Sequence, residues 1–258
     1  MNTDALLLAC RGYVPAPDAF AGRVILVTGA TAGIGRAVAR DLVRHGATVI
    51  LHGRNEQALE ALYQELKPLG TEPAVLQLDL ERAQGPQYLS LTSEIETRYG
   101  RLDGVLHNAA ILGDRSPIEH YDIGVWQRVL LVNLTAPFIL TRCLLPLLRK
   151  SADASVLFTT SSVGQRGRAY WGAYAISKSG LEGLAEVLAD ELENTLIRVN
   201  LINPGATRTR MRARAYPAEN PETLPTADSH TSAFLYLLGP ASEHVRGRRI
   251  ELRAPQPA

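Results

Sequence analysis

Cysteine is scarce in this chain, and its scarcity removes two classes of protein. Of the 258 residues only Cys10 and Cys143 are cysteines, too few for a disulfide framework and without the spacing of a zinc site. The six histidines show no ligand spacing either, so we expect no metal. Unpaired cysteines are typical of a reducing compartment, and we expect a cytoplasmic protein.

Net charge and long apolar segments are also lacking. The chain has 27 Lys and Arg against 26 Asp and Glu, so its net charge of +1 gives no global field for nucleic acid or an anionic membrane. The apolar run Leu6–Cys10 is short and lies between Asp4 and Arg11, unlike a signal peptide. We recognise no other stretch that approaches the roughly 20 apolar residues needed to cross a bilayer. We therefore expect small-molecule partners, without nucleic acid or a membrane.

No linker divides the chain, which predicts one domain with a large core. Residues 1–22 are predicted to be an irregular arm, because Gly12, Pro15, Pro17 and Gly22 interrupt any regular pattern. The domain itself is predicted to span residues 23–258.

Short apolar runs alternate with amphipathic segments from residue 23 onward. The strands are expected at about 24–27, 48–51, 74–78, 102–106, 155–158, 197–202 and 249–252. Helices are expected at about 34–46, 55–66, up to 99, up to 149, 171–193 and 232–238. Strands buried on both faces and separated by helices indicate a doubly wound α/β fold, a parallel sheet of about seven strands covered on both sides. Ligands of such Rossmann-type sheets lie beyond the carboxyl ends of the strands.

Three glycines follow the first predicted strand. Gly29, Gly33 and Gly35 permit a tight turn and let backbone N–H groups approach a pyrophosphate at the positive end of the next helix. A plain turn with close helix packing is the alternative, and the strand-turn-helix context makes it the less common one.

The end of the second predicted strand bears on which dinucleotide binds. The run Leu51-His52-Gly53-Arg54-Asn55 contains no carboxylate for a ribose 2′-hydroxyl, whereas Arg54 offers a planar fork that suits a 2′-phosphate. The pattern favours NADP(H) over NAD(H), although Arg54 could instead be a solvated residue at a helix start. Asp79, at the end of the third strand, is predicted either to accept a hydrogen bond from adenine or to cap the next helix.

Tyr174 and Lys178 are spaced to share one face of a helix. A phenol has an unperturbed pKa of about 10, and we expect the neighbouring ammonium group to lower the pKa of Tyr174 toward the working range. Such a phenol can exchange a proton with a carbonyl or alcohol oxygen.

These motifs, taken in order, resemble the short-chain dehydrogenase/reductase family of the compact single-domain kind. The resemblance is carried by Thr28–Gly35, Asn108-Ala109-Ala110, Asn133, Ser161, Tyr174 with Lys178, and Pro204-Gly205 with Thr207. It covers residues 23–252 and is most like the bacterial YciK-like oxidoreductases.

The resemblance implies a role for each matching residue. Tyr174 would be the general acid or base, and Lys178 would lower its pKa and hold the nicotinamide ribose. Ser161 would bind the substrate oxygen, and Asn133 would anchor a water in a relay to Lys178. We prefer Ser161 to Ser162 because it precedes Tyr174 by thirteen residues. The implied cofactor contacts are Thr28, Gly29, Thr31, Gly33, Ile34, Gly35, Arg54, Asp79, Leu80, Asn108, Ala109, Tyr174, Lys178, Pro204, Gly205 and Thr207.

The leading hypothesis is an oxidoreductase that transfers a hydride between NADP(H) and a carbonyl or alcohol substrate, assembled as a homodimer or homotetramer. The alternative is an NADP(H)-binding sensor or interaction protein without physiological turnover. A substrate loop is expected at about 206–228. The arginines that alternate there, Arg208, Arg210, Arg212 and Arg214, indicate either an acidic or phosphopantetheine-bearing substrate or simply a solvated loop.

Overall fold

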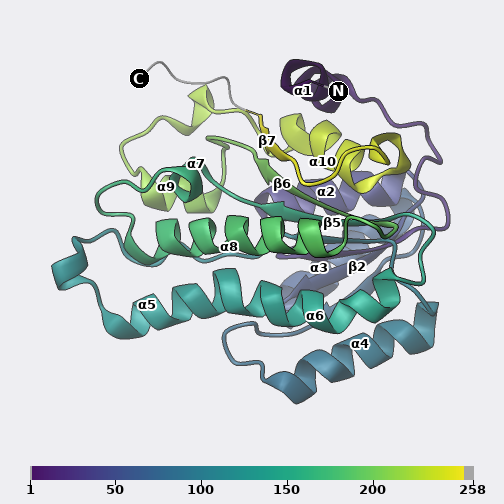
Figure 1. Ribbon diagram of the computed structural model, residues 1–258, viewed down its shortest axis with the longest axis horizontal. Coiled ribbons are helices and arrows are strands. Elements are labelled where there is room, and N and C mark those ends of the chain that lie inside the picture. The colour runs from purple at the N-terminus through teal and green to yellow at the C-terminus, as the bar shows by residue number, and fades with distance from the viewer. Residues whose placement is uncertain (1, 253–258) are drawn as a thin grey trace.

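A single parallel sheet organises the computed structural model, which describes residues 2–252 (Figure 1). Its strands are β1 (Val24–Thr28), β2 (Thr48–Gly53), β3 (Ala74–Gln77), β4 (Gly104–His107), β5 (Ala154–Thr159), β6 (Ile197–Asn203) and β7 (Arg249–Glu251). Their spatial order is β3-β2-β1-β4-β5-β6-β7, and all neighbours are parallel. The order reverses between β1 and β4, which opens a crevice beyond their carboxyl ends. The predicted doubly wound fold is thus confirmed.

Helices cover both faces of this sheet (Figure 1). The helical segments are α1 (Thr3–Gly12), α2 (Gly33–Arg44), α3 (Glu56–Leu66), α4 (Gly85–Tyr99), α5 (Ile123–Leu130), η3 (Leu131–Thr135), α6 (Ala136–Leu148), α7 (Ser162–Gln165), α8 (Gly172–Glu191), α9 (Arg210–Ala215) and α10 (Thr231–Leu238). Short 3₁₀ turns are η1 (Lys67–Leu69), η2 (Ile118–His120), η4 (Pro221–Thr223), η5 (Asp228–His230) and η6 (Pro240–Ser242). Alternate strand residues face opposite layers, so Ile25 packs toward α2 and α10, while Leu26 packs toward α4, α6 and α8.

The prediction that residues 1–22 are wholly irregular is wrong for α1. The Asn2 side chain caps this helix by accepting a hydrogen bond from the Ala5 N–H at 2.8 Å. Leu6 and Cys10, one turn apart, are buried against the layer that contains α10. Two buried positions give a weak periodic signal, and a helix this short is stabilised mainly by tertiary packing that the local sequence does not reveal.

The expectation about apolar segments also needs correction. Ile123–Leu148, which joins α5, η3 and α6, is a 26-residue helix that contains an 18-residue window with a mean hydropathy of 1.7, long and apolar enough to cross a membrane by length and composition. Its hydrophobicity is explained partly by the core, because Leu140, Leu144 and Leu148 are buried between α6 and the sheet.

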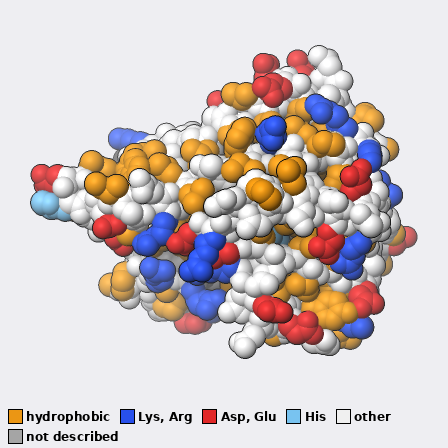
Figure 2. Space-filling model, turned by 90° about the horizontal axis from the view of Figure 1, so that it is seen from below, with side chains coloured by type: hydrophobic (Ala, Val, Ile, Leu, Met, Phe, Trp, Pro, Cys, Tyr) orange, Lys and Arg blue, Asp and Glu red, His pale blue; other side chains and the backbone are white. Residues whose placement is uncertain are grey.

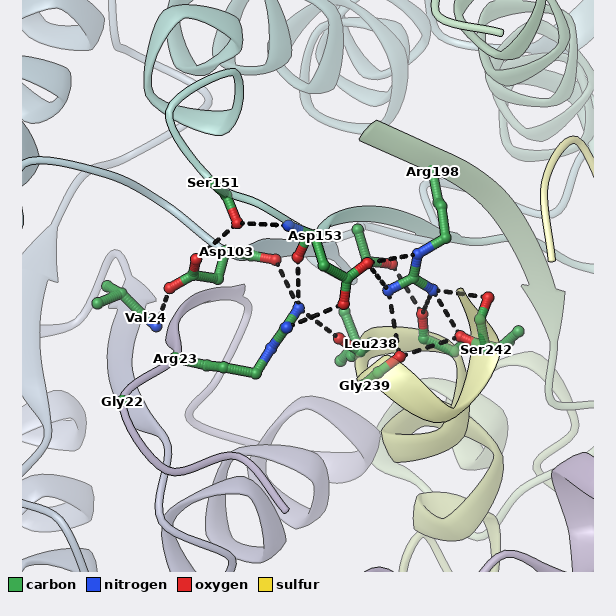
Figure 3. A network of polar contacts seen from close by, with 12 residues as sticks. Gly22, Arg23, Val24, Asp103, Ser151, Asp153, Arg198, Leu238, Gly239 and Ser242 are labelled. Atoms are coloured by element: carbon green, nitrogen blue, oxygen red, sulfur yellow. Dashed lines mark hydrogen bonds and ion pairs between the residues drawn. The ribbon is translucent and has the colours of Figure 1, made fainter. Parts of the chain in front are cut away.

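A buried network of charges closes the amino ends of the strands (Figure 3). Asp153, just before β5, forms ion pairs with Arg23 at 2.9 Å and with the fully buried Arg198 at 2.9 Å. Arg198 also donates to the Gly239 carbonyl at 3.1 Å and to Ser242 Oγ at 2.6 Å. These bonds tie β6 to the end of α10, at the opposite end of the sheet from the crevice.

Candidate active site

A cleft of about 880 Å³ lies beyond the carboxyl ends of the strands. It gathers residues from the ends of β1, β2, β4, β5 and β6 and from the loops that follow them. Most of the residues proposed from the sequence line it: Gly29, Thr31, Gly33, Ile34, Arg54, Asp79, Leu80, Asn108, Ala109, Ser161, Tyr174, Lys178, Pro204, Gly205 and Thr207.

Thr28, Gly35 and Asn133 are not among the residues that line the cleft, and Thr28 and Gly35 instead pack beneath it. Thr28 is buried, and its Oγ1 accepts hydrogen bonds from the N–H groups of Asn108 at 2.9 Å and Ala109 at 3.1 Å. Thr28 therefore joins β1 to the loop after β4. A Cβ on Gly35 would lie 2.3 Å from the Gly29 carbonyl oxygen, so Gly35 permits close packing under the cleft.

The turn between β1 and α2 has the features of an anion cradle. Gly29 has φ +64°, and a Cβ there would lie 2.9 Å from the Ala109 Cα. Ala32, at the N-cap of α2, provides no side-chain hydrogen bond to the first helical turn. The N–H groups of that turn are therefore available to a phosphate at the positive end of the helix.

Arg54 lies at the rim of the cleft with its side chain 66% exposed. Its Nη1 is 3.9 Å from the carboxylate of Glu81, which comes from the loop after β3. The sequence argument missed this carboxylate, because Glu81 is remote from β2 in the chain. An exposed ion pair of this length contributes little energy and leaves Arg54 able to contact a phosphate.

Asp79 also lines the cleft, and the alternative role considered for it is wrong. Its Oδ1 accepts a hydrogen bond from the Glu81 N–H at 3.1 Å, so it forms a turn. Gln84, not Asp79, is the N-cap of α4.

Tyr174 and Lys178 lie on one face of α8 and reach the same cleft, as their spacing predicts. Lys178 is 3% exposed, and its Nζ donates a hydrogen bond to the Thr159 carbonyl at 2.8 Å. The same Nζ lies 5.7 Å from the centre of the Tyr174 ring. Ser161, the residue we preferred to Ser162, lines the same cleft and acts on the pKa of Tyr174.

The expected lowering of the tyrosine pKa does not occur in this structure. Burial raises the pKa of Tyr174 to about 12, and the hydrogen bond with Ser161 only partly opposes it. Burial also lowers the pKa of Lys178 to about 8, against the attraction of Glu182. Desolvation is the largest influence on the pKa of Tyr174, so the phenol stays protonated at neutral pH.

Asn133 lies in the π-helical segment η3, fully buried. Its Oδ1 accepts from the Ile111 N–H at 2.8 Å, and its Nδ2 donates to the Ile111 carbonyl at 2.9 Å and to Ser177 Oγ at 3.1 Å. The side chain thus fixes the loop after β4 to α8. A water relay from Asn133 to Lys178 stays a prediction. A π-helical turn often marks a functional site, but the sequence pattern gives no sign of one here.

An apolar wall extends beyond Tyr174. The Trp171 ring lies 5.8 Å from that of Tyr174, with Met211 and Ala215 opposite on α9. The Arg115 guanidinium covers Trp171 at 4.6 Å and also Tyr216 at 5.1 Å. Arg115, Met211 and Ala215 belong to no motif recognised in the sequence, so their part in this wall is visible only in the folded chain.

The arginines of the predicted substrate loop fall into two pairs. Arg208 pairs with Glu222 at 3.0 Å, and Arg212 pairs with Glu219 at 2.6 Å, within the loop itself. Arg210 lines the cleft and Arg214 an adjoining hollow, and neither forms an ion pair within residues 2–252. Arg208 and Arg212, which also line the cleft, thus stabilise the loop through ion pairs, whereas Arg210 and Arg214 face open space without one among the described residues.

Known proteins are similar to this chain in both sequence and fold. A sequence model described as short chain dehydrogenase matches residues 23–220. The oxidoreductase YciK of Escherichia coli strain K12 is 48% identical over 240 residues, which are 93% of this chain and 95% of that protein.

Two similar solved structures contain a cofactor. One, a short chain dehydrogenase from Shigella flexneri in complex with NADP, has a TM-score of 0.90 and 46% identity over 93% of this chain and 100% of that one. The other, from Escherichia coli CFT073 in complex with NADPH, has a TM-score of 0.91 and 47% identity over the same shares. The dinucleotides named in those structures match the type of cradle found at the start of α2.

Proposed function

Because this chain belongs to the short chain dehydrogenase family of oxidoreductases, we propose that it transfers a hydride between NADP(H) and a carbonyl or alcohol substrate. One observation carries the proposal: Ser161, Tyr174 and Lys178 line the same cleft as the glycine cradle of α2. NADPH, when bound, would supply the hydride. The protein would bind and orient the cofactor and the substrate, and it would transfer the proton.

Tyr174 is assigned the proton. Because burial raises the pKa of Tyr174 to about 12, the phenol has a proton to give at neutral pH. Ser161 lines the cleft with the phenol and would contact the same substrate oxygen as charge develops on it. The Lys178 ammonium favours the phenolate that remains after transfer. This arrangement supports carbonyl reduction more directly than alcohol oxidation.

NADP(H) is proposed over NAD(H). The observations in favour are the absence of a carboxylate at the end of β2, the position of Arg54 at the rim, and the NADP and NADPH named for two similar structures. Arg54 would hold the 2′-phosphate, and the first turn of α2 would hold the pyrophosphate.

The substitution Tyr174→Phe tests the proposal directly. It should lower carbonyl reduction by two to four orders of magnitude, roughly the range for a lost general acid, while NADPH still raises the melting temperature of the variant. Near-normal reduction by the variant would reject Tyr174 as the acid.

One measurement separates the proposed enzyme from a sensor or interaction protein. A panel of aldehydes and ketones should support NADPH oxidation if the chain is an enzyme. Thermal stabilisation by NADPH, without oxidation across the whole panel, would instead favour a sensor or interaction protein.

The chain is also proposed to form a homo-oligomer. Exposed apolar side chains lie on neighbouring helices, with Phe138 on α6 47% exposed and Val187 on α8 55% exposed. Hydrophobic side chains also gather across the face seen in Figure 2, which includes the α5 and α6 side of Figure 1. Sedimentation velocity should report a dimer or tetramer that Val187→Lys dissociates, whereas Leu89→Lys, equally exposed on α4, leaves it intact. A monomeric native protein would reject this assembly.

A further inference from the structure

Glu182 is a buried carboxylate that the proposed reaction leaves without a role. It lies one helical turn after Lys178 on α8, and only 9% of it is exposed. Tyr174, Lys178 and Glu182 therefore form a stripe along one face of the helix. A buried carboxylate is costly unless charged or hydrogen-bonding groups surround it.

Two strands supply those groups. Thr160 Oγ1, just after β5, donates a hydrogen bond to Glu182 Oε1 at 2.5 Å. Arg249, in β7, places its Nε 3.2 Å from the same oxygen. Arg249 also pairs with Glu251 and donates to the Ser161 carbonyl at 3.4 Å. Glu182 thereby connects the last strand to the segment that carries Ser161.

Three successive residues at the end of β5 interact with the three residues of this stripe. The Thr159 carbonyl accepts from Lys178, the Thr160 hydroxyl donates to Glu182, and Ser161 lines the cleft with Tyr174 and acts on its pKa. The positions of the proposed catalytic groups therefore depend on how β5 is held against α8.

The packing leaves little freedom around Glu182. A Cβ on Gly164, in α7, would lie 2.7 Å from Glu182 Oε1 and 3.0 Å from both Lys178 Cβ and Thr160 Oγ1. The absence of a side chain at Gly164 lets α7 close over the carboxylate. In such a confined setting a charge acts more strongly on its neighbours than it would in water.

The charged groups that face Lys178 can be named element by element. Tyr174 and Glu182 come from α8, and Arg249 with Glu251 comes from β7 through Glu182. The segment after β5 contributes uncharged groups, and η3 contributes the neutral Asn133. Glu182 is thus the carboxylate that acts on Lys178, and it raises the pKa of that amine against the effect of burial.

We propose that Glu182, paired with Arg249, is a positioning residue for proton transfer: its carboxylate keeps the Lys178 ammonium charged and holds the end of β5 in register with α8. This inference rests on the proposed function for its catalytic consequence, but its electrostatic part can be measured without turnover.

The chain offers a direct measurement because it contains three lysines, Lys67, Lys150 and Lys178. Lysine labelled with ¹³C at Cε should give three resonances, and a pH titration reports the ionisation of each. Glu182→Gln retains the shape and an oxygen for Thr160 but removes the charge. We expect the Lys178 midpoint to fall by about one pH unit, the lower end of the range for a nearby charge. Lys67 and Lys150 are half-exposed and serve as internal controls.

Arg249→Gln provides the opposing variant, since it removes a positive charge near the same carboxylate. We expect the Lys178 midpoint to rise in this variant. Shifts of opposite sign do not follow from general loosening of the fold. Glu186→Gln, one turn further along α8 and exposed, should leave the midpoint unchanged.

The pH dependence of the reaction should change in the same direction as the Lys178 midpoint. In Glu182→Gln the alkaline decline of kcat/KM for carbonyl reduction should move to lower pH, and Glu182→Asp, which keeps the charge, should restore its position. An unmoved Lys178 midpoint in both Glu182→Gln and Arg249→Gln overturns the inference. If the midpoints shift as expected while the native protein reduces no carbonyl compound, the electrostatic role stands and the proposed function fails.

Discussion

Lys178 Nζ donates a hydrogen bond to the Thr159 carbonyl, so the ammonium group is fixed at the end of the strand that leads to Ser161. This bond holds the amine beside Tyr174, while burial lowers the pKa of Lys178 to about 8. The ionisation of Lys178 should therefore be visible in the pH dependence of the reaction.

Carbonyl reduction should decline above a pH of about 8, where the buried Lys178 loses its proton. Well above that pH the decline should approach about tenfold per unit if the charged amine is required. Lys178→Arg, whose guanidinium stays charged throughout this range, should be slower but should lose the decline. Steady-state kcat/KM from pH 6 to pH 10 checks this, with circular dichroism to confirm the fold at each pH. A native profile that stays flat to pH 10 would contradict it.

The substitution Arg54→Gln should weaken the binding of NADPH more than the binding of NADH. Loss of a charge-assisted bond to a phosphate costs about 1.5–3 kcal/mol, or roughly 10- to 100-fold in affinity. Titration of each dinucleotide against intrinsic fluorescence measures the ratio. Arg128→Gln is a matched control, because Arg128 Nε lies 3.8 Å from the same Glu81 but comes from α5. Equal weakening of both dinucleotides by Arg54→Gln would mean that Arg54 does not read the 2′-phosphate.

His52 should make the fold sensitive to acid. It is buried at the end of β2, and both ring nitrogens lack a hydrogen-bond partner among residues 2–252. Burial lowers its pKa to about 4, so the unfolded chain binds more protons between pH 6.5 and 4 and stability falls as the pH drops through that window. The loss attributable to His52 is roughly 3 kcal/mol. His107, whose pKa burial lowers to about 3, adds to it.

The melting temperature of the variant His52→Leu should therefore fall less between pH 7 and pH 5 than that of the native protein. At pH 7 its stability should be equal or higher, because a buried polar ring without partners is replaced by an apolar side chain. Thermal unfolding followed by circular dichroism measures both effects. His120→Leu, at an exposed position in η2, should reproduce the native acid dependence. An unchanged acid dependence in His52→Leu would show that this ring does not titrate on unfolding.

The features that could be predicted from the sequence are those encoded over a few residues. The run Val24–Val27 ended by Gly29 is enough to place a buried strand and its turn. The four-residue spacing of Tyr174 and Lys178 is enough to place both in one cleft. These signals arise from the periods of helix and strand and from the backbone freedom of glycine, which do not depend on distant contacts.

Other features depend on contacts between segments far apart in the chain. Glu81 approaches Arg54, and Arg249 approaches Glu182, only after the sheet has formed. The pKa of Tyr174 could not be predicted from the neighbouring amine alone, because its burial is a property of the assembled cleft. The contacts of Asn133 with Ile111 and Ser177 likewise join segments remote in the chain, and the proton relay expected of Asn133 stays a prediction.

The network around Asp153 gives the molecule two unlike ends. At one end, Arg23 and Arg198 hold the strands together through ion pairs with Asp153. At the other end, backbone turns and exposed arginines surround an open space. We therefore expect any rearrangement on ligand entry to be confined to the loops above the sheet, while the base keeps the spacing of the strands constant.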